Sequence, residues 1–170
     1  EDTFSLHRWN FLLTKITEES HSSDTFIWGN LQIENWMERF LVAKEGLPWT
    51  SYTTGERICN SILFYNYFGK VPSKSVLTGI SVFAEHLINN IEYHGNYYTG
   101  NHVINNARAI YFAGQFLQVQ AWSEISRAVL IRELEMLITK DGFLRDGSSH
   151  YHFLFTRWML EICWVAEKTG

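Results

Sequence analysis

The chain has 170 residues, enough for one compact domain or for a piece of a larger protein. It is strongly aromatic, with seven Trp, eight Tyr and twelve Phe, and its formal net charge of −4 comes without a basic stripe, which argues against a nucleic-acid partner. An anionic substrate stays possible because a cleft needs only local positive charge. No window approaches the roughly 20 uncharged apolar residues of a membrane span, so we expect no membrane-spanning segment.

The two cysteines, Cys59 and Cys163, stand in apolar segments and are expected to be buried free thiols, although a disulfide stays open. The first residues, EDTFSLHRWNFLLTK, lack the charged-then-apolar pattern of a signal peptide and resemble an internal start. Localisation is therefore left open. The last segment is still apolar at Trp164 and Val165, so we interpret the chain as part of a longer protein.

Helical periodicity dominates the chain, and no segment alternates like a strand. The first predicted helix has Asp24 as a cap, and Gly69 closes the second. The predicted helical segments are 24–46, 55–69, 73–95, 103–117, 121–142 and 149–170. Short links between them favour antiparallel neighbours. We predict an all-α protein of six or seven helices, in which residues 1–170 form a single domain of helical hairpins.

The first candidate site is Gly100-Asn101-His102, at the head of an apolar-striped helix. Asn is a favoured N-cap, so Asn101 is interpreted either as a cap or as a side chain that serves catalysis. His102 is interpreted either as a structural residue or as the partner of Asn101.

The second candidate is DGFLRDGSSHYH, residues 141–152. A solvated turn explains Asp141 and Gly142 well. It explains Tyr151 between two histidines much less well, so Tyr151 and His152 are candidate site residues.

The third candidate is PWTSYTTGERICN, residues 48–60, in which Trp49, Tyr52, Arg57 and Asn60 surround a helix start. The aromatic rings could stack on a sugar or pack in the core. Arg57 could bind an anionic substrate, pair with a glutamate or lie on the surface.

Other chemistries fit less well. His102, His150 and His152 would offer three imidazoles to zinc, but no carboxylate is suitably spaced, so no metal or other cofactor is expected. DGSSH is not a nucleophile elbow. Paired carboxylates for glycoside hydrolysis stay open, because Glu85, Glu92, Asp141 and Asp146 are all available.

Taken together, the three candidates resemble the helical domain of the heparinase II/III-like polysaccharide lyases. The resemblance covers about two-thirds of the chain, from Trp49 to the end. The family pattern G-N-H-x-x-x-N-x-x-A-x-x-x-A-G is matched by Gly100, Asn101, His102, Asn106, Ala109, Ala113 and Gly114. Its E-x-S-x-x-Y-H pattern is matched by Asp146, Ser148, Tyr151 and His152, with Asp in place of the usual Glu. Residues 96–99 (NYYT) are interpreted as an insertion.

The resemblance implies part of an (α/α) toroid and β-elimination at a uronic acid in a heparan-, alginate- or capsule-like polysaccharide. It implies that Asn101 and His102 neutralise the uronate carboxylate and that Tyr151 is the general acid and base. Trp49, Tyr52, Arg57, Asn60 and His152 are then predicted to bind substrate.

In the family, β-sandwich domains complete the site. The sequence holds nothing like them, so this chain alone is expected to be inactive. Characterised members are periplasmic or secreted. Two alternatives stay open: an (α/α) toroid glycoside hydrolase, and a non-catalytic polysaccharide-binding protein of a surface-polymer pathway.

Overall fold

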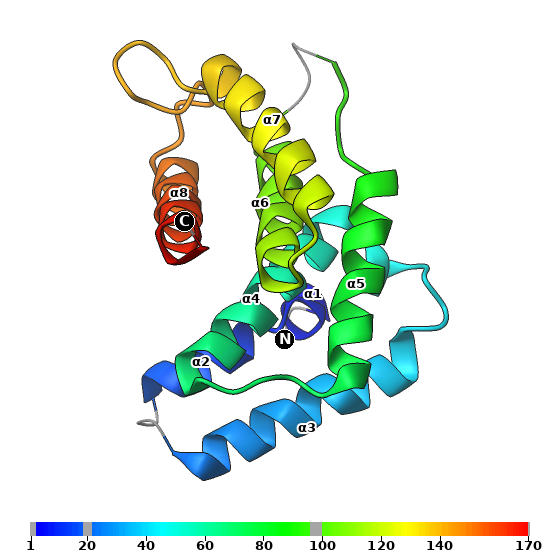
Figure 1. Ribbon diagram of the computed structural model, residues 1–170. Coiled ribbons are helices and arrows are strands. Elements are labelled where there is room, and N and C mark those ends of the chain that lie inside the picture. The colour runs from blue at the N-terminus through cyan, green and yellow to red at the C-terminus, as the bar shows by residue number, and fades with distance from the viewer. Residues whose placement is uncertain (1–2, 19–21, 96–99, 170) are drawn as a thin grey trace. The chain divides into compact units, whose positions relative to one another are not determined.

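The computed structural model describes residues 3–18, 22–95 and 100–169, and this part of the chain is all-α (Figure 1). Its helices are α1 (Thr3–Arg8), α2 (Asn10–Glu18), α3 (Ser23–Phe40), the short 3-10 helix η1 (Leu47–Trp49), α4 (Ser51–Phe68), α5 (Lys74–Asn89), α6 (Asn101–Phe116), α7 (Gln120–Leu137) and α8 (Ser149–Thr169). Within these ranges the only β pairing is an isolated bridge between Ile138 and Leu144. The predicted all-α class is confirmed.

The chain divides into two compact units, residues 1–89 and residues 90–170. Unit 1 contains α1 to α5 with η1, and unit 2 contains α6, α7 and α8. Each unit is described by itself below. The prediction that residues 1–170 form one domain stays a prediction.

The N-terminal segment of unit 1 forms two short helices that the periodicity did not indicate. Trp9 separates α1 from α2 with a left-handed φ of 62°, which ends the first helix. Its ring is fully buried and meets Trp36 and Phe83 edge-to-face at centroid distances of 5.5 and 6.2 Å. Aromatic packing thus holds a turn that an ordinary residue adopts only at a cost.

In unit 1, α4 and α5 form an antiparallel hairpin. Gly69 ends α4 in the left-handed conformation with φ of 60°, as predicted for the glycine at that position. Near the far end of α5, the Nε2 atom of His86 lies 2.8 Å from the carbonyl oxygen of Trp49, just before α4 begins. The prediction that Asp24 caps the helix now labelled α3 was wrong. Ser22 caps α3 by accepting from the backbone N–H of Thr25 at 3.1 Å, and Asp24 lies in the first turn.

In unit 2, α6 and α7 also run antiparallel and approach closely at Gly114. A Cβ atom at Gly114 would lie 2.8 Å from the backbone nitrogen of Ser123, so only glycine fits this contact without a shift. Between α7 and α8, the Asp141–Gly142 segment forms the predicted turn, in which Gly142 has a φ of 82°.

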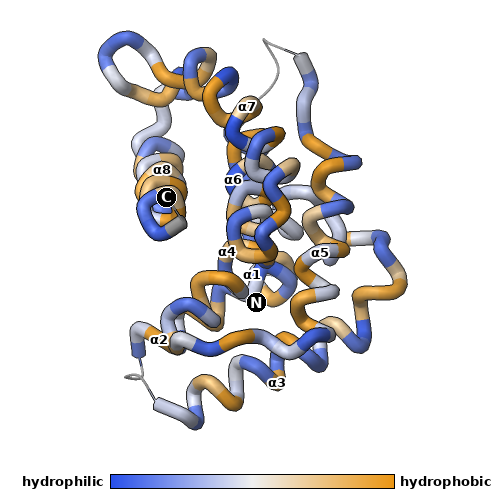
Figure 2. The backbone as a smooth tube through the Cα atoms, viewed as in Figure 1, coloured by the Kyte–Doolittle hydropathy of each residue, from blue (hydrophilic) through white to orange (hydrophobic). Residues whose placement is uncertain are grey.

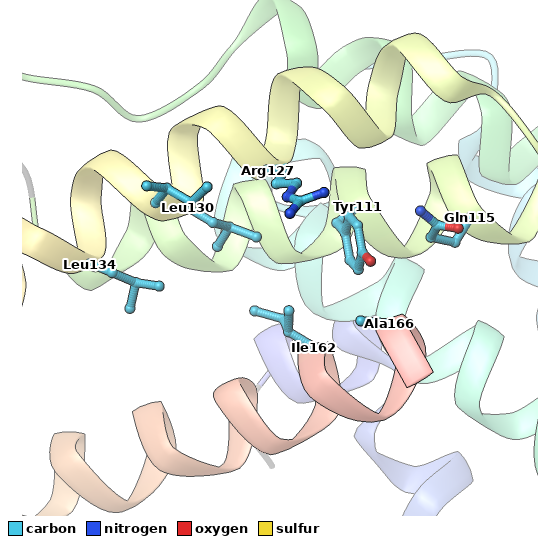
Figure 3. Close-up of a pocket in the computed structure, with 8 residues that line it drawn as sticks. Tyr111, Gln115, Arg127, Leu130, Leu134, Ile162 and Ala166 are labelled. Atoms are coloured by element: carbon cyan, nitrogen blue, oxygen red, sulfur yellow. The ribbon is translucent and has the colours of Figure 1, made fainter. Parts of the chain in front are cut away.

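The helices α6 and α8 of unit 2 run in the same direction. Figure 3 shows the ring of Tyr111 in α6 pointing toward Ala166 in α8, with Ile162 one turn earlier along α8 and Gln115 one turn further along α6. In agreement with this order, Arg108 of α6 lies 3.4 Å from Glu161 of α8, the residue that follows it by 53 positions. The two helices begin at the same end of unit 2.

Figure 2 shows apolar and polar residues mixed along α8. Phe155 and Trp158 are buried, whereas Phe153 and Leu160 are exposed, as is Cys163. The prediction of a buried Cys163 was therefore wrong, because apolar residues surround α8 on more than one side and only one side is packed. Cys59 is buried as predicted, and both thiols are free. None of the described helices is both long and apolar enough to span a membrane.

Candidate functional site

The shared direction of α6 and α8 brings two predicted clusters to one end of unit 2. Both helices rise about 1.5 Å per residue, so the contact of Arg108 with Glu161 can be followed back along them. Counting back seven residues along each helix leads from Arg108 to Asn101 and from Glu161 to Leu154, so the first turn of α8, with Tyr151 and His152, lies a few residues beyond the start of α6. Side chains some 50 positions apart in the sequence thus belong to the same end of a helix pair.

Asn101 is the first residue of α6 and is partly exposed. Gly100 occupies the N-cap position in an extended conformation, and no side chain caps the helix. The cap interpretation of Asn101 was therefore wrong. The described residues offer no hydrogen-bond partner to its side-chain amide, which can thus donate to a ligand at the helix start.

His102 belongs to a hydrogen-bonded cluster with Glu92 and Asn106. The Nδ1 atom of His102 lies 3.1 Å from Oε1 of Glu92. The buried Asn106 holds the same glutamate twice. Its Oδ1 accepts from the backbone N–H of Glu92 at 2.9 Å, and its Nδ2 donates to Oε2 at 3.2 Å. The His102 side chain remains 53% exposed.

These contacts shift the titration of Glu92. Half-burial by itself favours the neutral acid, but the hydrogen bond and charge of His102, the hydrogen bond from Asn106 and the charge of His94 outweigh it. The pKa of Glu92 therefore lies below its usual value of 4.5. At neutral pH the cluster holds an ionised carboxylate.

Tyr151 stands in the first turn of α8 with 46% of its surface exposed. Its backbone N–H points to Oγ of Ser148 at 3.4 Å, and its ring meets His150 edge-to-face at 5.6 Å. In the described part of the chain the phenol oxygen has no hydrogen-bond partner. The hydroxyl is thus positioned for exchange of a proton with a bound molecule.

His152 packs toward the preceding turn. Its Nδ1 accepts from the backbone N–H of Leu144 at 3.4 Å, and its ring lies 5.2 Å from that of Phe143. This role fixes the link between α7 and α8 at the start of α8. Contact between His152 and a substrate stays a prediction. The predicted insertion at 96–99 lies outside the described residues.

The first half of the third cluster is internal to unit 1. Trp49 is 3% exposed, and its indole N–H donates to the carbonyl oxygen of Phe40 at 2.9 Å. The guanidinium of Arg8 covers the ring of Tyr52 at 4.8 Å. Trp49 is thus buried and one face of the Tyr52 ring is covered, and the stacking of either ring on a sugar stays a prediction.

The second half of that cluster ties the N-terminal segment to α4. Arg57 is fully buried and donates to the carbonyl oxygen of His7 at 2.8 Å, while Asn60 donates to that of Arg8 at 2.9 Å. The rings of Trp36 and Phe83 lie 4.0 and 4.4 Å from the Arg57 guanidinium carbon. The interpretation of Arg57 as a surface residue was wrong. Substrate binding by Arg57 and Asn60 stays a prediction without an exposed surface to support it.

Figure 3 shows a pocket of about 430 Å³ among the three helices of unit 2. Its lining is mostly apolar and includes Tyr111, Leu130 and Ile162, and it contains no predicted site residue. It begins ten positions beyond Asn101 along α6. Among the side chains that the structure describes, no three His, Cys, Asp or Glu residues are grouped to hold a metal ion.

The family profile described as Heparinase II/III N-terminus matches residues 5–170. The chain belongs to this family. No curated protein and no solved structure matches it. Membership indicates a polysaccharide lyase family and a polysaccharide substrate, in agreement with the resemblance carried by the motifs.

In this heparinase II/III N-terminal chain, motif residues have two kinds of role. Gly114 permits close packing of α6 on α7, and Asn106 fixes Glu92, so both serve the architecture. Asn101 and Tyr151 make no comparable contact with the described residues. The pattern alone does not separate these roles, because it records residue types and spacing only.

Sequence reasoning missed an ion pair of unit 2 that involves a buried arginine. Arg108 is fully buried in α6 and lies 3.4 Å from Oε2 of Glu161 in α8, with its guanidinium over the ring of Trp158 at 5.1 Å. The available signal was an arginine inside the apolar run that follows Asn106. This pair shows which parts of α6 and α8 lie beside one another.

Proposed function

We propose that the chain is the helical part of a polysaccharide lyase that cleaves a uronic-acid-containing polymer by β-elimination. The observation that carries the proposal is the shared direction of α6 and α8, whose starts, with Asn101, His102 and Tyr151, lie at one end of unit 2. The candidate polymers are heparan-, alginate- and capsule-like polysaccharides, which all present a uronate carboxylate.

Two helix starts at one end favour an anionic ligand. The first backbone N–H groups of a helix have no partner within it, and the helix dipole adds partial positive charge there. Both α6 and α8 contribute such groups to the same end of unit 2. A uronate carboxylate is suited to this position.

The elimination requires the proton at C5, next to the carboxylate. While that carboxylate is ionised, removal of the proton places a second negative charge on the same group. In the proposal, the Asn101 amide and the His102 ring donate hydrogen bonds to the carboxylate oxygens and so stabilise this charge. The partly exposed amide of Asn101 supports the assignment.

Tyr151 is assigned the proton transfers. A base takes the C5 proton, the electron pair forms the C4–C5 double bond, the C4–O bond breaks, and an acid protonates the leaving oxygen. The exposed phenol of Tyr151 can give its proton to that oxygen, and as phenolate it can take the C5 proton. A phenol acts as a base at neutral pH only where nearby cations favour its ionised form.

The test follows the ultraviolet absorbance of the unsaturated product on a panel of uronate polysaccharides. The assay uses both the 170-residue chain and the full product of the gene that encodes it. Removal of the proton-transfer group in Tyr151→Phe is expected to lower kcat by about 10²-fold or more. Loss of a donor in Asn101→Ala is expected to lower kcat by about 10²- to 10³-fold.

Two matched variants control for general damage. Tyr67→Phe changes a tyrosine with 45% exposure, against 46% at Tyr151, and Asn89→Ala removes an exposed amide from the end of α5. Both are expected to retain the activity of the parent. Full activity of Tyr151→Phe would contradict the proposal. New reducing ends without absorbance would indicate a hydrolase, and binding without cleavage would indicate a polysaccharide-binding protein.

A further inference from the structure

The side chain of Glu92 is held on both of its oxygens beside the proposed site. Both of its carboxylate oxygens are engaged, Oε2 by the buried Asn106 and Oε1 by Nδ1 of His102. Its backbone N–H is bound by the same Asn106, and the neighbouring Tyr93 hydroxyl accepts from Arg132 of α7 at 2.9 Å. The carboxylate therefore has little freedom to turn away from His102.

This geometry decides which ring nitrogen of His102 carries a proton. An ionised carboxylate only accepts hydrogen bonds, so the contact of 3.1 Å requires a proton on Nδ1. Ionisation is favoured here, because His102 and Asn106 hold the pKa of Glu92 below its usual value. Free imidazole carries its neutral-form proton on either nitrogen, and a bound carboxylate selects one of them.

We propose that Glu92 is a positioning residue that holds the His102 ring by its Nδ1 and fixes the proton of the neutral ring on that nitrogen. The role resembles that of outer carboxylates that orient histidines elsewhere in proteins. The catalytic part of this inference rests on the proposed lyase function; the tautomer part stands without it.

The consequence for the proposed reaction depends on which ring nitrogens of His102 can donate a hydrogen bond. With Nδ1–H directed at Glu92, Nε2 of a neutral ring is an acceptor and would repel a uronate carboxylate. Only the imidazolium form donates from both nitrogens. In that form Nδ1–H still donates to Glu92 and Nε2–H can donate to the uronate, while Asn101 serves as a neutral donor.

The first experiment is a long-range ¹H–¹⁵N NMR spectrum of the His102 ring in the 170-residue chain at a pH where the ring is neutral. The signals are assigned by their loss in His102→Gln. The wild type is expected to show a protonated Nδ1. A wild-type ring protonated on Nε2 would overturn the proposal without any further variant.

The second arm compares Glu92→Gln with Glu124→Gln, which changes an exposed glutamate of α7 that hydrogen-bonds to Gln120. In Glu92→Gln, Asn106 retains the side-chain oxygen, so the new amide group faces His102 and favours the Nε2–H form. The control is expected to retain the wild-type tautomer. An unchanged His102 signal in Glu92→Gln would overturn the proposal.

The activity arm separates this inference from the proposed function. In the full gene product, Glu92→Gln is expected to lower kcat/KM for elimination by at least about tenfold, as for other residues that orient a catalytic group. A changed tautomer with full activity would overturn the catalytic part. A wild type that performs no elimination would overturn the proposed function, and the ring tautomer would still decide whether Glu92 positions His102.

Discussion

Each unit contains a charged side chain that neighbouring residues hold in place, and the two clusters differ in whether they reach the protein surface. Arg57 of unit 1 is fully buried, and its described contacts are a carbonyl oxygen, a threonine hydroxyl and aromatic rings. Glu92 of unit 2 is half-buried, and its outermost partner, His102, is 53% exposed at the side chain. One cluster is closed by the protein, and the other ends at the surface.

The difference distinguishes a structural motif from a site. Burial lowers the pKa of Arg57 well below its usual range, because the guanidinium has lost its water, and aromatic faces offset part of that loss. Such a group stabilises the fold where it lies. The cluster of Glu92 directs an exposed imidazole instead, so its effect is expected in chemistry more than in stability.

The largest expected effect tests the closed cluster. Arg57→Ala removes a buried side chain, leaves a cavity among Trp36 and Phe83, and leaves the carbonyl oxygen of His7 without its donor. We expect a loss of about 3–5 kcal/mol in the free energy of unfolding of unit 1. Urea unfolding followed by tryptophan fluorescence measures it.

The control for Arg57 is Arg39→Ala, which removes an exposed arginine from α3 of the same unit. It is expected to change the free energy of unfolding by no more than about 0.5 kcal/mol. Equal unfolding midpoints for Arg57→Ala and Arg39→Ala would show that the buried cluster does not hold unit 1 together.

The next effect compares two glycines of the same family pattern in unit 2. At Gly114 a Cβ atom would lie 2.6 Å from Oγ and 2.8 Å from the backbone nitrogen of Ser123, so Gly114→Ala must separate α6 from α7. We expect a loss of about 1–3 kcal/mol. At Gly100, φ is −112° and an added Cβ atom would meet nothing within 4 Å among the described residues beyond its chain neighbours, so Gly100→Ala is expected to be tolerated.

Thermal unfolding of the two glycine variants, monitored by circular dichroism, measures the difference. A Gly100→Ala variant as unstable as Gly114→Ala would indicate that the start of α6 is more tightly packed than its described surroundings show.

The sequence predicted most of the helices because their apolar periodicity and glycine stops are local signals. Gly69 and the turn at Gly142 were predicted for that reason, and both adopt left-handed backbone conformations. The break at Trp9 was not predicted, because its cause is the packing of its ring on Trp36 and Phe83, which are distant in sequence.

The candidate site was predicted in part. Motif spacing identified Asn101, His102 and Tyr151, but their common end depends on the parallel pairing of α6 and α8, which no periodicity records. The contact of His102 with Glu92 joins residues ten positions apart. This separation is not one that a helix brings together, so the contact could not be predicted from the sequence. The burial of Arg57 could not be predicted from the sequence pattern either, because an arginine near a helix start is more often exposed.

A smaller effect tests whether Trp49 belongs to the closed cluster. Trp49→Phe removes the indole N–H that donates to Phe40 and shortens a buried side chain, with an expected loss of about 1–2 kcal/mol. Trp28→Phe, in which the parent ring is 37% exposed, is the matched control. Weaker polysaccharide binding by Trp49→Phe at unchanged stability would assign Trp49 to substrate instead.

The smallest expected effect is a difference in acid sensitivity between the two units. Burial, and then the charge of Arg57, lower the pKa of His7; its Nδ1 accepts from the Trp36 indole at 3.0 Å, a contact that protonation of Nδ1 would break. The pKa of His86 is lowered chiefly by burial, which outweighs its hydrogen bond to the Trp49 carbonyl. Both values lie below 6.5, so the unfolded chain binds more protons between the folded pKa and 6.5. Their stabilisation of unit 1 is therefore complete above pH 6.5 and is lost as the pH falls through the folded values.

Glu92 of unit 2 has a lowered pKa as well, but its window lies lower, since its contribution is complete above its usual value of 4.5. Between pH 7.5 and 5.5 we therefore expect native-state amide exchange, corrected for the intrinsic rate, to show a greater loss of protection in α4 than in α6. His86→Gln, which retains a donor for the Trp49 carbonyl but does not titrate, should reduce the change in α4 and leave α6 as it was. Equal losses in the two helices would mean that the buried histidines of unit 1 do not set its response to acid, and the contrast between the closed and the open cluster would then rest on the mutations alone.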